Sequence, residues 1–149
     1  MATTYCYFDG TIAGQMIPPK NEIVTTHPTI IRNVVDFSLQ ELDESEDDIA
    51  QVLYVPAGTL VLFAGIRIIT AGTADSTVNF GITGSVVDSW GDGVALDATA
   101  GTVTQVMLEP QYVAAADTLD IIGTDDTTSV DIDAKIEVFA CCIKVQNTY

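Results

Sequence analysis

The stretch VDIDAKIEV, residues 130–138, alternates apolar and charged side chains without a break. Successive residues of a β-strand point to opposite faces, so this pattern predicts a strand with one face toward a core. Its inward positions would be Val130, Ile132, Ala134, Ile136 and Val138. Its outward positions begin with Asp131, Asp133, Lys135 and Glu137, and then turn apolar at Phe139, Cys141, Ile143 and Val145. A loop or a neighbouring subunit is therefore expected to cover the end of this strand.

Similar segments recur along the chain. Residues 31–39 alternate in the same way, with inward positions at Ile31, Asn33, Val35, Phe37 and Leu39. Further strands are expected at residues 52–55, 60–69, 77–83, 102–108 and 119–122. Turn-forming residues separate them, as at Pro56-Ala57-Gly58 and Gly91-Asp92-Gly93. Short strands spaced roughly 8–12 residues apart are typical of a sandwich or barrel. The expected fold class is all-β, a β-sandwich, and about eight strands favour a jelly roll.

The first 28 residues differ from the rest of the chain. They hold three of the five prolines, which favour extended backbone. We therefore expect an extended N-terminal arm, residues 1–28, followed by a single β-sandwich body, residues 29–149. The arm is too apolar for a solvated tail, so it should pack on its own body or dock on a neighbour. Its candidate partner-binding residues are Tyr5, Tyr7, Phe8, Ile12, Met16 and Ile17.

The chain is strongly acidic. Its 21 acidic residues and 5 basic residues give a net charge of −16. Such a surface is repelled by nucleic acid and by anionic membranes, so neither is an expected partner. Part of the charge lies in residues 41–48, which predict a solvated connector. No basic leader or long apolar run marks a signal peptide or membrane span, which favours synthesis in a cytoplasm.

No constellation in the sequence indicates catalysis or a cofactor. His27 is the sole histidine, and motifs for nucleophiles, phosphate loops or paired metal ligands are missing. The three cysteines do not suggest a disulfide framework, and Cys141 and Cys142 are expected to be buried free thiols. The protein is therefore predicted to be no enzyme and to need no metal or cofactor.

Two acidic turns and one tryptophan remain open to a binding role. Residues 88–93, and Asp125 and Asp126 with Asp131 and Asp133, could supply oxygen ligands to calcium, but ordinary turn and strand chemistry is favoured. Trp90 could stack on a sugar, although a place at the end of the core is favoured for a large aromatic side chain.

Three segments, VPAGTLV at 55–61, FGITG at 80–84 and AADTLDI at 115–121, together with the closing strand through Ile143, resemble tailed-bacteriophage capsid decoration (cement) proteins. Members of that group have jelly-roll or related β-sandwich bodies. The resemblance implies a homotrimer, made in the host cytoplasm, that binds the major capsid protein on the outside of the virion and stabilises the head. The arm would then add a strand to a sheet edge of a capsid subunit.

Two alternatives stay open beside decoration. The first is another phage structural role, as a head fibre base or a tail protein. The second is a carbohydrate-binding β-sandwich that uses Trp90, Tyr112 or Tyr54 as a stacking platform. An enzyme ranks third, because no base and nucleophile can be paired.

Overall fold

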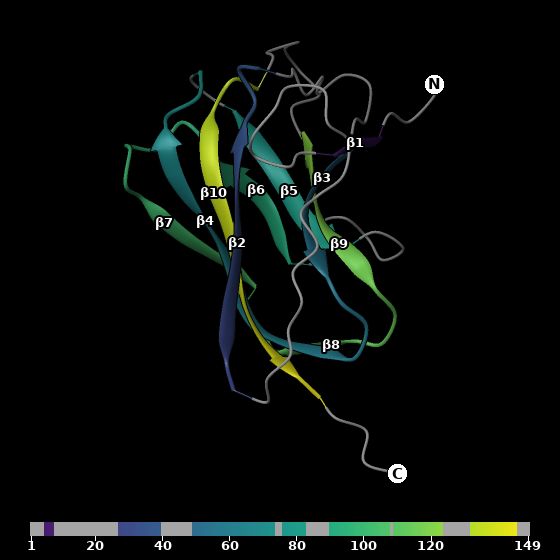
Figure 1. Cartoon of the computed structure of the whole chain (residues 1–149). Helices are drawn as coiled ribbons and strands as arrows, with labels where there is room; N and C mark the ends of the chain where they lie inside the picture. Colours follow the sequence, from purple (N-terminus) through teal and green to yellow (C-terminus); the bar gives the residue numbers. More distant parts are fainter. Residues whose placement is uncertain are drawn as a thin grey trace.

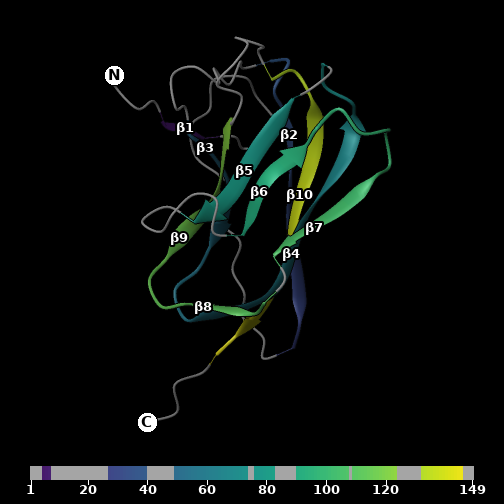
Figure 2. The ribbon, with the colours of Figure 1, turned by 180° about the vertical axis from the view of Figure 1, so that it is seen from behind.

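The computed structural model describes residues 5–7, 27–39, 49–73, 76–82, 90–107, 109–123 and 132–145. Regular structure in these residues is entirely β, and the strands form two sheets that face each other (Figures 1 and 2). This part of the chain contains no helix that could cross a membrane. The all-β prediction is confirmed.

The strands form two sheets, called A and B below, and each has one side toward the core and one outer side. Sheet A contains, in spatial order, β1 (Tyr5–Tyr7), β3 (Ile49–Val55), β9 (Asp117–Gly123), β5 (Thr77–Ile82) and β6 (Gly91–Ala95). Sheet B contains β2 (Thr29–Asp36), β10 (Lys135–Lys144), β4 (Thr59–Thr70) and β7 (Val103–Met107), and the short β8 (Gln111–Val113) also pairs with β4.

The strand pairing is nested. The antiparallel pairs are β2 with β10, β3 with β9, β4 with β7, and β5 with β6. The chain thus runs as one long hairpin whose two halves wrap around each other. The pairs β10–β4 and β9–β5, also antiparallel, join the wrapped halves into sheets. Eight strands connected in this way form a jelly roll, so the predicted sandwich and its topology are both present.

The core lies between the sheets and follows the predicted alternation. Ile132, Ala134, Ile136 and Val138 are all buried, whereas Val130 and Asp131 lie outside the described residues. The facing sheet contributes the fully buried Phe80, Leu119 and Ile121. Trp90 packs beside Phe80 with ring centroids 6.1 Å apart, and its indole N–H donates to Gln111. Trp90 is 7% exposed, so it belongs to the core as favoured.

One polar side chain in the core connects the two sheets. Asn33 of β2 is buried, and its Nδ2 donates to the carbonyl of Val52 in β3 over 2.9 Å. A buried amide is tolerated where it is hydrogen-bonded, so the predicted inward position of Asn33 is compatible with the apolar core.

Two local predictions were wrong. Leu39 was placed on the inward face, but β2 ends at Asp36 and Leu39 lies in the following turn, 66% exposed. Gly91-Asp92-Gly93 was interpreted as a turn, but it begins β6. Two residues there oppose Asn79 alone, a β-bulge, and Gly93 provides the positive φ of 61°. The Gly93 N–H donates to Asn79 Oδ1 over 2.9 Å, which fixes the bulge.

Candidate interaction surface

The outer face of sheet B is formed by the residues that alternate with the buried ones. Cross-strand register places Arg32 of β2, Phe139 of β10 and Gly65 of β4 in one row. The rows on either side continue the same face. This surface, called the B face below, comprises Ile30, Arg32, Val34, Asp36, Leu60, Phe63, Gly65, Arg67, Thr70, Val103, Gln105, Tyr112, Lys135, Glu137, Phe139, Cys141, Ile143 and Val145.

The middle of the B face is apolar. The Phe139 ring covers Gly65 so closely that a Cβ on Gly65 would lie 2.6 Å from Phe139 Cζ. One row away, Cys141 lies between Ile30 and Phe63 and is only 6% exposed. The predicted covering at the end of β10 is therefore present at Cys141 alone. Phe139 and Ile143 are half-buried and Val145 is 37% exposed.

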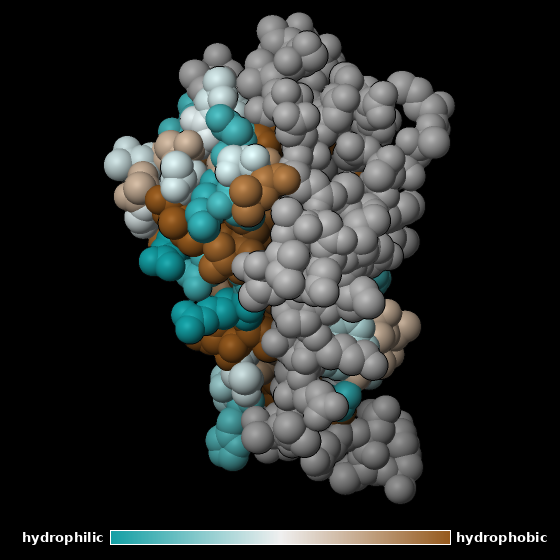
Figure 3. Space-filling model, turned by 45° about the horizontal axis from the view of Figure 1, so that its top comes forward, coloured by the Kyte–Doolittle hydropathy of each residue, from teal (hydrophilic) through white to brown (hydrophobic). Residues whose placement is uncertain are grey.

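Exposed apolar side chains gather on this side of the molecule. Among the described residues, four of the five large apolar side chains that are exposed lie on a strand of sheet B or directly after one, and Leu39 lies in the turn that follows β2. These are Ile30 at 61%, Leu39 at 66%, Val103 at 58%, Tyr112 at 47% and Val145 at 37%. In Figure 3, brown apolar side chains reach the surface beside teal polar ones. An antiparallel sheet facing water is ordinarily polar on its outer side, so this composition indicates a binding surface.

The basic residues gather there as well. In the part of the chain that the structure describes, the lysines and arginines are Arg32, Arg67, Lys135 and Lys144, and all four lie on strands of sheet B. The first three belong to the B face. The Nζ of Lys144 instead donates to the carbonyl of Ala57 at the end of the sandwich.

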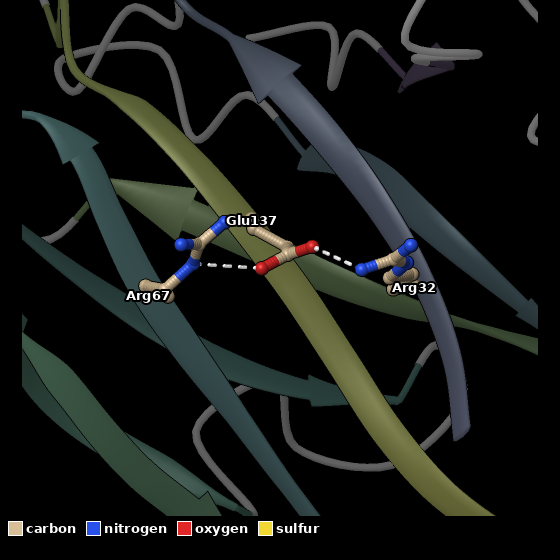
Figure 4. Close-up of polar contacts among 3 residues, drawn as sticks. All are labelled: Arg32, Arg67 and Glu137. Atoms are coloured by element: carbon tan, nitrogen blue, oxygen red, sulfur yellow. Dashed lines mark hydrogen bonds and ion pairs between the residues drawn. The ribbon is translucent and has the colours of Figure 1, made fainter. Parts of the chain in front are cut away.

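Glu137 connects two of these cations (Figure 4). Its Oε1 lies 3.4 Å from Arg32 NH1, and its Oε2 accepts a hydrogen bond of 2.8 Å from Arg67 Nε. The Glu137 side chain is 12% exposed, whereas those of Arg32 and Arg67 are 72% and 47% exposed. The carboxylate is thus held in the sheet while both guanidinium groups extend into solvent, where they can bind further carboxylates.

A second ion pair closes one end of the B face. Lys135 Nζ lies 3.1 Å from Asp36 Oδ2, and the Ser38 hydroxyl donates to Asp36 Oδ1 over 2.5 Å. The hydrogen bond from Ser38, followed by Lys135, lowers the pKa of Asp36 below its usual value.

The outer side of sheet A is different. Gln51 and Asp120 lie opposite each other in the β3–β9 pair, and Thr118 shares their face. These polar residues are buried, at 7%, 0% and 8% exposure, and the Thr118 hydroxyl donates to Asp120 over 2.7 Å. No grouping of His, Cys, Asp or Glu that could hold a metal occurs in the described ranges.

The thiols of β10 lie on opposite faces, as expected. Cys141 belongs to the B face and Cys142 to the core, and neither forms a disulfide. Burial raises the pKa of both thiols, and that of Cys142 to about 12. Both are therefore protonated near neutral pH, and their role is packing.

The predicted arm site is only partly described. Tyr5 and Tyr7 belong to β1, which pairs in parallel with β3 of the same chain, Tyr5 opposite Ile49. Phe8, Ile12, Met16 and Ile17 lie outside the described residues, as does the acidic connector 41–48. Of the two candidate calcium sites, residues 88 and 89 of the first and Asp125, Asp126 and Asp131 of the second also lie outside them.

The three aromatic residues of the carbohydrate alternative are not brought together. Trp90 is buried in the core, Tyr54 is half-buried in sheet A, and Tyr112 is exposed on the B face. The sequence prediction missed the B face as a unit. Its signal was present in the apolar outward positions that follow Glu137, but the pairing that places Arg32 and Arg67 beside them is not visible in one strand.

No protein-family model and no curated protein matches the sequence. Chains of three solved structures do match. The acid-stable capsid of Helicobacter pylori bacteriophage KHP30 matches with 13% sequence identity and a TM-score of 0.56. The capsid asymmetric unit of cyanophage Pam1 matches with 17% identity and a TM-score of 0.55, and the capsid of Ralstonia phage GP4 with 11% identity and a TM-score of 0.56.

The matches cover most of this chain and nearly the whole of each matching chain. In the order KHP30, Pam1 and GP4, they cover 80%, 89% and 97% of this chain and 90%, 96% and 100% of the matching chain. The matching chains are therefore about as long as this one. This chain shares its fold with chains of phage capsids.

Proposed function

We propose that the protein is a structural, non-enzymatic component of a bacteriophage head, a decoration protein that binds the outside of the major capsid shell and stabilises it. The observation that carries the proposal is the match to chains of three phage capsids over nearly their whole length.

The surface properties support an exterior location. A net charge of −16 keeps a protein apart from packaged DNA and reduces non-specific association between particles. We further propose that the protein is a homotrimer and that its N-terminal arm, from Tyr5 to Ile17, contributes to attachment. β1 pairs with β3, so the first residues of the arm extend sheet A of their own subunit, and the rest of the arm would make the attachment.

The decisive experiment is reconstitution on heads. Heads are assembled from the genome that carries the gene, with that gene deleted, and are mixed with purified protein before sedimentation. We expect saturable co-sedimentation with heads, no association with isolated tails, and greater resistance of the decorated heads to heating. Binding to tails alone would replace decoration by a tail role, and binding to neither would overturn the proposal.

A truncation separates the contribution of the arm. Removing residues 1–19 should leave the circular dichroism of a folded β-protein and weaken head binding. Light scattering of the full chain should give the mass of a trimer. An unfolded truncation would show instead that the arm is part of its own subunit's core, and a monomeric mass would remove the trimer from the proposal.

A further inference from the structure

We infer that the B face is the surface through which the body docks on the capsid shell, and that its partner there is a protein surface carrying acidic side chains around an apolar centre. This inference rests on the proposed function and specifies its contact. It places part of the binding on the folded body, in addition to the arm.

The apolar part of the argument comes from exposure. Ile30, Val103 and Tyr112 are 61%, 58% and 47% exposed, and they surround the half-buried Phe63, Phe139 and Ile143. Burying these apolar side chains against a partner removes their surface from water, which favours association. The anchors of protein interfaces are commonly aromatic side chains and arginines, and the B face presents both.

The electrostatic part identifies the partner. In a chain of net charge −16, the four described lysines and arginines lie on sheet B, and Arg32, Arg67 and Lys135 belong to the B face. An acidic partner would be repelled by the protein as a whole and attracted at this face, so charge would orient the encounter. Arg32 is 72% exposed and Arg67 is 47% exposed, so their guanidinium forks are available to carboxylates.

The same charges disfavour a two-fold pairing of B faces, whereas a trimer contact, in which the B face meets a different surface of the next copy, is separated from docking by the oligomeric state measured below. Two B faces packed against each other would oppose arginine to arginine in a pair of molecules that each carry −16. Like charges directly opposed across an interface cost free energy and select against that pairing.

The experiment uses the full chain and gene-deleted heads, with affinity measured by co-sedimentation. The charge variant is Arg32→Glu, and its control is Lys144→Glu, which changes the net charge equally but lies at the end of the sandwich. The apolar variant is Val103→Asp, and its control is Ala95→Asp on the exposed edge strand β6 of sheet A. Sedimentation velocity of unbound protein records the oligomeric state of each.

We expect Arg32→Glu and Val103→Asp each to weaken head binding by about tenfold or more, while both controls bind like the wild type. Wild-type affinity should also fall as NaCl is raised. If the wild type binds and all four variants bind equally, the inference is overturned and the proposed function stands. If the wild type does not bind heads, both fail. If the B-face variants dissociate an oligomer, whether or not head binding falls, the occupant is a second copy, which also overturns the inference.

Discussion

The outer faces of the two sheets differ in the polarity and the burial of their side chains. On sheet A the outward residues Gln51, Thr118 and Asp120 are polar and yet buried within the single chain. On sheet B the outward residues Ile30 and Val103 are apolar and yet more than half exposed, at 61% and 58%. The Thr118 hydroxyl donates to Asp120 within the chain.

The difference separates residues that hold the fold from residues that are available to a partner. Burying a polar group stabilises a protein only when its hydrogen bonds are made inside, so the outer side of sheet A is part of the folded structure. Exposed apolar area adds nothing to the stability of an isolated chain, so the B face can change without unfolding it. Substitutions can test this division.

The largest effect is expected within sheet B itself. Ile136 is 0% exposed and faces the core between Val35 and Ile68, so Ile136→Asp would bury a charge without a partner. The cost is on the order of several kcal/mol, enough to unfold the domain. Ile30→Asp on the outer face of the neighbouring strand β2 should leave the midpoint of urea unfolding nearly unchanged. A folded Ile136→Asp variant would refute the assignment of the two faces.

A matched pair of carboxylates compares the outer faces directly. Asp120→Ala on sheet A removes the acceptor of the Thr118 hydroxyl in a fully buried site, and we expect a loss of about 2–3 kcal/mol. Glu137→Ala on sheet B breaks two ion pairs whose cations are largely exposed, and we expect under about 1 kcal/mol. Both values come from urea titrations at neutral pH. Equal losses would show that the B face has a structural role like that of sheet A.

Strands with strict alternation could be predicted from the sequence, whereas short or irregular strands could not. The inward residues of β10 could be predicted because charged and apolar residues alternate strictly along it. β6 could not, because glycine and aspartate are rare in strands and the bulge at Gly93 depends on pairing with Asn79. β8 spans only Gln111–Val113, too short to show a period.

The candidate site was predicted less well than the fold. The apolar residues after Glu137 were recognised as needing a cover, but Arg32 and Arg67 are remote from them in sequence and meet Glu137 only through the order β2–β10–β4. Strand order follows from the wrapping of the whole chain, which alternation within one strand does not determine. Burial of Trp90 likewise depends on Phe80 and Gln111, which lie in other segments.

A smaller effect is expected at the centre of the B face. A Cβ on Gly65 would meet Phe139 Cζ at 2.6 Å and the backbone oxygen of Thr104 at 2.8 Å. Gly65→Ala should therefore destabilise the domain by about 1–2 kcal/mol through overpacking. Thermal unfolding compares the cost of Gly65→Ala in the wild type with its cost in the Phe139→Ala background, which isolates the part due to the ring. A smaller but nonzero cost is expected in that background, because the contact with the Thr104 backbone oxygen remains. A neutral Gly65→Ala would mean that the ring does not pack on this glycine.

The smallest effect concerns the ion pair at the end of the B face. Hydrogen bonds from Ser38 and the charge of Lys135 lower the pKa of Asp36 below its usual value. A carboxyl that binds its proton more weakly when folded stabilises the protein above its unfolded pKa, and this contribution is lost as the pH falls through the folded pKa. Asp36→Asn should therefore cost under about 1 kcal/mol at pH 6 and flatten the decline of stability toward pH 3.

Urea titrations of the wild type and Asp36→Asn at both pH values measure that difference. A parallel decline in the two proteins would remove Asp36 from the pH dependence. If Asp36→Asn and Glu137→Ala both lower the free energy of unfolding only slightly, the charges of the B face contribute little to the stability of the isolated protein. The cations on this side of an acidic protein would then matter mainly for binding. A bound partner excludes water from the B face, and charge interactions there become stronger than they are in the isolated protein.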